Sequence, residues 1–287
     1  MIPLWIIFAL ATAILWATYA LLSRSLAKES PSPLAFAVIF GIWASAVSFI
    51  PALWEPWTFT DVTVLVLWVT FLATVFFGLY QGLEFFARKH LEASRSTIFF
   101  QLAPVISFIG GALFLSEPFT LMKVGAVALI VGGNIVALYK HGGAVSAKGA
   151  LYMLGVVIGL GMGYVADKFV IGHYPIALYS AISYFFPSLY CLAILAFQKG
   201  WIAELKNESV RLGWKLPILA LVGTAGYYFA LKTFLIADVS VAVPVIFTST
   251  IFTALGGILI LGERGSIPQK ILGALIVFSG VVLLQLS

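Results

Sequence analysis

The sequence predicts an all-α polytopic membrane protein: ten transmembrane helices in two inverted five-helix repeats, residues 1–143 and 144–287. Three observations lead to this fold class. Apolar residues make up 62% of the chain and charged residues only 9%, whereas about a quarter of an ordinary soluble domain is charged. Ten apolar stretches are long enough to cross a bilayer, which takes about 20 residues. A Gly-Gly…Glu motif occurs twice, about half a chain apart, which indicates duplication.

Turn-forming residues separate the ten apolar stretches. Ser-Pro-Ser-Pro at residues 30–33 and His-Gly-Gly at residues 141–143 are typical of turns between helices. The longest polar connection, residues 198–211, is expected to be a loop, and no connection is long enough to form a separate aqueous domain. The predicted spans are residues 3–22, 34–53, 62–86, 95–115, 121–139, 149–171, 176–197, 214–236, 241–261 and 268–286.

The duplicated motif indicates how the two halves are oriented. The glycines at 110–111 precede Glu117, and the glycines at 256–257, which lie 146 residues later, stand in the same relation to Glu263. Each repeat has five spans, an odd number, so the second repeat must enter the membrane from the opposite side. The glycines are expected to allow close helix contact, and the two glutamates are expected to have capping or loop roles at helix ends.

The distribution of positive charge predicts the orientation in the membrane, because cytoplasmic loops accumulate Lys and Arg. Three basic residues, Lys123, Lys168 and Lys232, fall on the side of the even-numbered connections. This bias predicts a multi-pass protein of the cell membrane with both termini outside the cytoplasm. The basic residues in or beside the odd-numbered connections are Arg24, Lys28, Arg88, Lys89, Arg95, Lys140, Lys148, Lys199, Lys206, Arg211, Lys215, Arg264 and Lys270.

The remaining composition argues against several other classes of protein. The single cysteine, Cys191, allows no disulfide framework within the chain and no cysteine-based metal site, and the three histidines show no ligand spacing. No P-loop or other nucleotide-binding motif is found. We therefore expect no metal, no cofactor, no nucleic-acid partner and no enzymatic activity, and a protein that acts as a monomer in the lipid bilayer.

Further marks repeat between the halves or stand in the first span. Each Gly-Gly…Glu motif is followed by a Gly…Leu-Ile-Val…Gly helix, Trp16 and Tyr19 stand in span one, and residues 93–94 and 239–240 open spans four and nine as Ala-Ser and Val-Ser. With the ten spans, these marks resemble the EamA branch of the drug/metabolite transporter superfamily over essentially the whole chain.

The resemblance implies a ten-helix bundle around a central cavity, lined mainly by spans one, three, four, six, eight and nine. Members of the family move small metabolites: some export amino acids, and others carry nucleotide sugars or sugar phosphates. The bacterial exporters are usually described with both termini in the cytoplasm. That orientation is opposite to the one that the charges predict, so the orientation and the direction of transport stay open.

Glu84 and Lys232 are the leading candidates for charged groups that act in transport. Aligned through Tyr80 and Tyr228, they occupy equivalent positions in spans three and eight, and they would lie toward opposite faces of the membrane. Ionisable side chains within spans are costly and usually functional. We expect gates or contacts to a substrate headgroup, with Glu84 also able to exchange a proton. The alternative is that each side chain reaches from a helix end to the interface.

Uncharged polar and aromatic side chains provide the other candidates. Gln81 lies one turn before Glu84, and Gln101 lies at the depth of residues 248–250 in span nine. Adjacent Asp167 and Lys168 point about 100° apart around span six, and we expect them chiefly to neutralise neighbouring helices or to end the span. Aromatic faces could hold an apolar or cationic substrate, although packing is the alternative for each. The aromatic candidates are Trp16, Tyr19, Tyr80, Phe100, Tyr164 and Tyr228.

These observations lead to one principal functional hypothesis and two alternatives. The principal hypothesis is a secondary transporter that exports a small-molecule substrate, an amino acid or a related amphipathic compound, by alternating access driven by a substrate or proton gradient. The first alternative is an exchanger of phosphorylated or nucleotide-linked sugars, which is less favoured because such anions need several convergent basic groups. The second alternative is a lipid scramblase or an intramembrane enzyme.

Overall fold

The computed structural model describes residues 3–28, 30–90, 98–139, 146–259 and 267–286, and the elements in these ranges are all helical. Nine helical segments of this part are long and apolar enough to cross a membrane, and a shorter apolar helix, Ile98–Phe114, takes the place of the tenth. The prediction of an all-α polytopic membrane protein is therefore confirmed. The elements are α1 (Leu4–Lys28), α2 (Pro33–Val47), η1 (Ile50–Leu53), α3 (Val64–His90), α5 (Ala103–Phe114), α6 (Leu121–Leu138), α7 (Ala147–Val170), η2 (Ile171–His173), α8 (Ile176–Ala196), α9 (Trp201–Leu212), α10 (Lys215–Ile236), α11 (Val239–Ile246), α12 (Ser249–Leu259) and α13 (Ile267–Gln285).

The polar connection at residues 198–211 is largely a helix, α9, so the prediction of a loop there was wrong. Gly200 and Gly213 flank this helix with φ angles of 81° and 47°, which glycine adopts without strain. Between the two glycines, Glu208 and Leu212 face inward and are buried. The charged residues of this stretch therefore belong to an amphipathic helix and not to an irregular connection.

Short polar side chains fix where two of the spans begin. Thr120 Oγ1 accepts a hydrogen bond of 3.1 Å from the backbone N–H of Lys123 at the start of α6. Ser146 Oγ accepts one of 3.3 Å from the N–H of Gly149 at the start of α7. Each cap satisfies a backbone donor that the first turn of a helix leaves without a partner.

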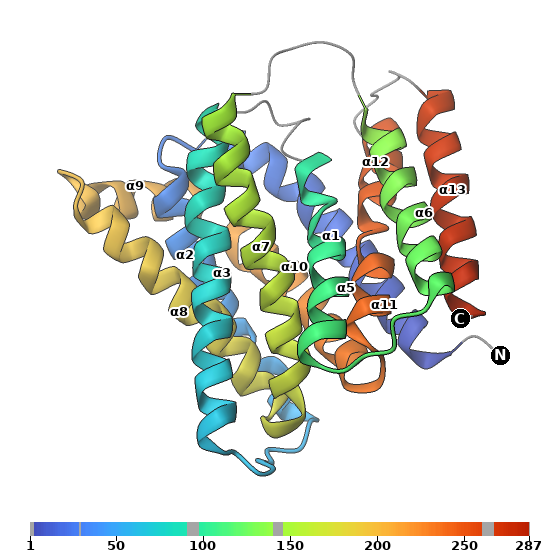
Figure 1. Ribbon diagram of the computed structural model, residues 1–287. Coiled ribbons are helices and arrows are strands. Elements are labelled where there is room, and N and C mark those ends of the chain that lie inside the picture. Colours follow the sequence, from blue (N-terminus) through green and yellow to red (C-terminus); the bar gives the residue numbers. More distant parts are fainter. Residues whose placement is uncertain (1–2, 29, 91–97, 140–145, 260–266, 287) are drawn as a thin grey trace.

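The helices pair as an inverted repeat requires. α3 packs along α7, and α1 packs along α10; the repeat relates α1 to α7 and α3 to α10, so these two contacts are equivalent. α2 packs on its own counterpart, α8, and α6 packs on its own counterpart, α13. Gly133 and Gly273 permit the close approach of α6 and α13, since a Cβ atom added to Gly273 would lie 2.5 Å from the carbonyl oxygen of Gly133. Figure 1 shows α6 beside α13. The predicted boundary after residue 143 lies outside the described residues.

The two ends of the bundle differ, and each can be identified in Figure 1. α1 begins and α13 ends at one end, which we call the terminus end, and α9 lies near the other, which we call the α9 end. Along the outer surface, large apolar side chains such as Trp68 and Leu121 are exposed. An apolar outer surface suits contact with lipid and not with water.

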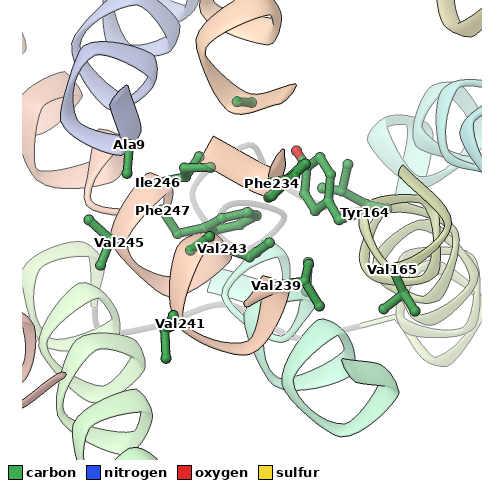
Figure 2. Packing of buried hydrophobic residues seen from close by; sticks show 14 of the residues in the cluster. Ala9, Tyr164, Val165, Phe234, Val239, Val241, Val243, Val245, Ile246 and Phe247 are labelled. Carbon is green, nitrogen blue, oxygen red and sulfur yellow. The ribbon is translucent and has the colours of Figure 1, made fainter. Parts of the chain in front are cut away.

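Aromatic and aliphatic side chains fill the interior between the two halves. Figure 2 shows the valines of α11 in this core, together with Tyr164 and Phe234, whose ring centroids are 5.8 Å apart. Trp16 stacks on Tyr164 at 6.2 Å, and Phe77 contacts Tyr164 edge-on at 6.1 Å. These rings come from α1, α3, α7 and α10, the helices that the resemblance places around a cavity. In this conformation they are in mutual contact.

Candidate functional site

Two helices at equivalent positions of the repeat are each interrupted by a two-residue turn. The helix Ile98–Phe114 is interrupted by turn residues Gln101 and Leu102, and α11 is separated from α12 by turn residues Phe247 and Thr248. The second break follows the first by 146 residues, which is the offset of the Gly-Gly…Glu motifs. Broken spans leave backbone groups free for other partners, and in transporters with inverted repeats such breaks mark the substrate or ion site.

A buried polar network joins the two breaks. Gln101 Nε2 donates to Thr250 Oγ1 at 3.0 Å, and Asn134 Nδ2 donates to Gln101 Oε1 at 2.9 Å. Asn134 Nδ2 also lies 3.3 Å from the carbonyl oxygen of Phe247, at the second break. Gln101 is 1% exposed and Asn134 is fully buried. The network links α6 and the two broken helices, and so joins one half of the chain to the other.

The same region holds polar atoms that lack a partner within the described residues. Asn134 Oδ1 and Thr248 Oγ1 are both buried and make no hydrogen bond there. Buried oxygens without a donor are rare in folded proteins and call for an explanation, such as a ligand or ordered water. Neutral oxygens of this kind can accept from an ammonium, amide or hydroxyl group. The sequence predicted Gln101 as a site residue and placed residues 248–250 at its depth, but Asn134 was missed.

Lys232 lies in a charged cluster at the terminus end. Its Nζ lies 2.8 Å from Glu55 Oε1, and the hydroxyl of Tyr228 donates to the same oxygen at 2.5 Å. The Lys232 ammonium also lies 5.7 Å from the centre of the Tyr228 ring, and Trp54 Nε1 donates to the Tyr228 hydroxyl at 3.4 Å. Burial alone would raise the pKa of Glu55, but the hydrogen bonds from Lys232 and Tyr228 outweigh it and lower that pKa.

Glu84 lies far from this cluster. Glu55 precedes the start of α3, whereas Glu84 lies near the end of that helix. The neighbouring Leu83 side chain packs at Gly155 in the first turns of α7, toward the α9 end. Gln81 Oε1 lies 3.8 Å from the thiol of Cys191, which donates to it. The prediction that Glu84 and Lys232 point to opposite ends of the bundle agrees with these contacts, but their roles as gates stay predictions. Glu55 as the partner of Lys232 was missed.

Asp167 is the most deeply buried acidic group in the described spans, whereas its sequence context predicted chiefly a role in neutralising neighbouring helices or ending the span. Its side chain is fully buried. Tyr179 donates to Oδ1 at 2.5 Å and Tyr227 donates to Oδ2 at 2.9 Å. Lys168 points elsewhere, since its Nζ donates to the carbonyl oxygen of Phe234 at 2.7 Å. Asp167 and Lys168 therefore face different partners, as their spacing predicted. The partners of Asp167 lie on α8 and α10, and the partner of Lys168 lies on α10.

The predicted aromatic candidates fall into separate groups. Trp16 stacks on Tyr164, and its Nε1 donates to the carbonyl oxygen of Gly223 at 3.3 Å. The Tyr19 ring packs on Phe40 at 5.4 Å and also lies against Gly223. Tyr80 contacts Phe100 edge-on at 6.1 Å, next to the first helix break, and Tyr228 belongs to the Lys232 cluster.

The first Gly-Gly…Glu motif holds the two halves together. Glu117 accepts hydrogen bonds of 2.7 Å and 2.9 Å from the backbone N–H groups of Val239 and Ser240, the first residues of α11. A side chain on Gly111 would collide with this carboxylate, since a Cβ atom there would lie 2.5 Å from Glu117 Oε2. The predicted capping role of Glu117 is thus confirmed, whereas Glu263 lies outside the described residues. A carboxylate at a helix N-terminus also meets the positive end of the helix dipole.

Comparisons with known proteins agree with this architecture. The family model described as the EamA-like transporter family matches residues 3–139 and again residues 147–286. A stretch of 68 residues is 37% identical to a protein of Archaeoglobus fulgidus described as an uncharacterized transporter, and it covers 24% of this chain and 24% of that protein. A solved crystal structure superimposes with a TM-score of 0.72 at 16% identity, covering 98% of this chain and 96% of the other. That likeness concerns the fold alone.

Proposed function

Since the chain belongs to the EamA-like transporter family, and so is a multi-pass membrane transporter, we propose that it moves a small metabolite by alternating access. The observation that carries the proposal is the pair of helix breaks at Gln101 and Phe247, related by the offset of the repeat and joined by Asn134. Exchanging the conformations of two inverted halves converts a site open to one side into a site open to the other. Such an exchange moves a bound substrate across the membrane and changes none of its covalent bonds.

The polar groups at the breaks favour an amino acid or a related amphipathic compound. Asn134 Oδ1 and Thr248 Oγ1 offer neutral acceptors, and the rings of Tyr80 and Phe100 next to the first break offer apolar and π surface. An ammonium group combined with an apolar side chain matches both kinds of surface.

A phosphorylated or nucleotide-linked sugar is a weaker match for the described part of the chain. Of the basic residues within its spans, Lys232 is paired with Glu55 and Lys123 with Asp238. Lys168 is bound to the carbonyl oxygen of Phe234. Such anions need several convergent basic groups. The exchanger of sugar phosphates therefore remains the alternative.

We place the α9 end in the cytoplasm. Lys206 and Arg211 lie in α9 and Lys199 lies just before it, so the basic residues of this odd-numbered connection gather at the α9 end. In this orientation both termini lie outside, and the Glu55–Lys232 cluster closes the outer end. We propose a location in the cell membrane, export of the substrate, and a monomer as the acting unit.

Flux measurements on purified protein in proteoliposomes test the proposal. The panel contains radiolabelled amino acids, radiolabelled sugar phosphates and a fluorescent phospholipid, so that each alternative gives its own signal. We expect saturable uptake of at least one amino acid, and a loss of that uptake in Gln101→Ala but not in Ser279→Ala, which removes an exposed hydroxyl on α13. Saturable uptake of a sugar phosphate alone, or lipid movement alone, would replace the proposal by the corresponding alternative.

A further inference from the structure

Asp167 carries a carboxylate into the interior of a membrane span, where ionised groups are costly and usually functional. Tyr179, from α8, and Tyr227, from α10, each donate a hydrogen bond to one of its two oxygens. Two phenol donors stabilise the carboxylate but leave its negative charge in place. The carboxylate therefore needs a cation that neutralises its charge during transport.

The described residues provide no basic side chain for this carboxylate. Lys168, its neighbour in sequence, donates to the carbonyl oxygen of Phe234. Carbonyl groups in the last turn of a helix lack intrahelical partners, so the end of α10 is a stable position for this ammonium. Lys232 is paired with Glu55. Neither lysine is placed to neutralise Asp167.

A proton suits the surroundings of Asp167 better than a metal ion does. Hard cations such as Ca²⁺ or Mg²⁺ take about six or more oxygen ligands. Here the observed polar neighbours of the carboxylate are the hydroxyl groups of Tyr179 and Tyr227, and the described residues hold no cluster of metal-ligating side chains. A proton needs one carboxylate oxygen and no added space.

The other titratable groups around Asp167 are phenols and one ammonium group. Phe77 of α3 contacts the ring of Tyr227, Gly110 of α5 lies against Val165 of α7, and Val239 of α11 belongs to the same hydrophobic core. The titratable neighbours are Tyr164 and Lys168 on α7, Tyr174 before α8, Tyr179 and Tyr184 on α8, and Tyr227 on α10.

Two adjacent tyrosines connect Asp167 to the charged cluster at the terminus end. Tyr227 donates to Asp167, and Tyr228, the next residue of α10, donates to Glu55, the partner of Lys232. A proton on Asp167 removes the negative charge and makes one oxygen a donor, so the hydrogen bond from the tyrosine on that oxygen weakens or reverses its direction. A shift of Tyr227 moves the backbone of Tyr228 with it.

We propose that Asp167 is a proton-binding site of the transport cycle and that its occupancy is linked to the Glu55–Lys232 pair through Tyr227 and Tyr228. The inference rests on the proposed transport function. A proton from water at the terminus end binds one carboxylate oxygen and forms an O–H bond. The same bond breaks when the site opens to the α9 end, and the proton passes to water there. One proton thus crosses inward while the substrate crosses outward.

Infrared spectroscopy of the purified protein tests proton binding without any substrate. The C=O stretch of a protonated carboxyl group is followed from about pH 5 to about pH 9, a range in which an exposed carboxyl group stays ionised. We expect a band that titrates in the wild type, is lost in Asp167→Asn and is kept in Glu84→Gln. Tyr227→Phe removes a donor to the carboxylate and should shift the midpoint upward by about one pH unit. A band that survives in Asp167→Asn, or that vanishes in Glu84→Gln, would overturn the assignment.

Spin-label distances test the link to the charged cluster. Labels at Trp57→Cys and Ile236→Cys, two exposed positions on either side of the cluster, are placed in a chain in which Cys191 is replaced by Ala. We expect the distance distribution to change across the same midpoint in the otherwise wild-type chain and to stay fixed in Asp167→Asn. A distribution that ignores pH would overturn the link. Neither measurement needs flux, so a failed substrate screen leaves this test intact.

Discussion

Lys232 Nζ lies 2.8 Å from Glu55 Oε1 and thereby ties the second half of α10 to the connection that precedes α3. The repeat alignment makes Lys232 equivalent to Glu84, but the lysine pairs with a carboxylate that has no marked counterpart in that alignment. Tyr228 reinforces the pair by donating to the same oxygen. The terminus end of the bundle is therefore held by an ion pair between the two halves.

Breaking this ion pair from either side should destabilise the protein. Both side chains are largely buried, with exposures of 24% for Lys232 and 15% for Glu55. Lys232→Met leaves the Glu55 carboxylate without its cation, so we expect a loss of about 1–3 kcal/mol in unfolding free energy. The double variant Lys232→Met/Glu55→Gln should lose less than the sum of the single variants. Thermal unfolding in detergent measures this, and strictly additive losses would contradict a direct pair.

The contribution of Glu55 should disappear only in acid. Its pKa in the folded protein is lower than the ordinary 4.5, because hydrogen bonds from Lys232 and Tyr228 outweigh the effect of burial. A lowered carboxyl pKa adds stability above the unfolded pKa, and that stability is lost as the pH falls through the folded pKa. The difference in melting temperature between wild type and Glu55→Gln should stay constant from about pH 7 down to about pH 5 and shrink below pH 4.5. A difference that already shrinks above pH 5 would refute this account.

Gly111→Ala should disrupt the contact between the two halves at α11. The new Cβ atom would lie 2.5 Å from Glu117 Oε2 and 2.9 Å from the Val239 side chain, so the carboxylate must leave the N–H groups that it caps. We expect a loss of about 1–3 kcal/mol, measured by thermal unfolding. Gly132→Ala is the matched control, since nothing lies within 4 Å of a Cβ atom there, and alanine favours a helix by about 1 kcal/mol. Equal effects of the two substitutions would contradict the role of Gly111.

Gln101→Ala should impair transport more than stability alone explains. The substitution removes the acceptor of Asn134 Nδ2 and the donor to Thr250 Oγ1, so buried polar groups at both helix breaks lose a partner. We expect uptake of the transported amino acid to fall by about tenfold or more. Thr250→Val removes one end of the same network and should act in the same direction. Normal uptake by both variants would exclude the network from the substrate pathway.

The fold was predictable because composition and repeat act over the whole chain. The apolar stretches gave the spans, and the 146-residue offset of the Gly-Gly…Glu motifs gave the equivalence of the halves. The same offset relates the two helix breaks at Gln101 and Phe247. The sequence alone did not reveal this relationship, because it did not show where the helices are interrupted. For Glu117 the sequence predicted a capping or loop role, and the carboxylate does cap a helix, but that helix is α11 of the other half and not the one that Glu117 follows.

Partners across the bundle were not predictable from one sequence. Glu55 lies in a short turn between spans, and no local pattern distinguishes it from an ordinary loop residue. Asn134 lies in an apolar run of α6 and contacts both halves only after folding. Asp167 was recognised as an acidic residue within a span, but its proposed role in proton binding depends on hydrogen bonds from Tyr179 and Tyr227, which come from two other helices. Such contacts are set by helix packing and not by spacing along the chain.

Crosslinking of the charged cluster tests alternating access most directly. In a chain with Cys191→Ala, the substitutions Glu55→Cys and Lys232→Cys allow a short bifunctional thiol reagent to bridge the connection before α3 and α10, and the unbridged double variant is the control. Counterflow of the transported amino acid is then measured in proteoliposomes. We predict that the unbridged double variant keeps a measurable counterflow, reduced by the loss of the ion pair, and that bridging abolishes what remains. Equal counterflow before and after bridging would contradict a transport cycle in which this end opens and closes.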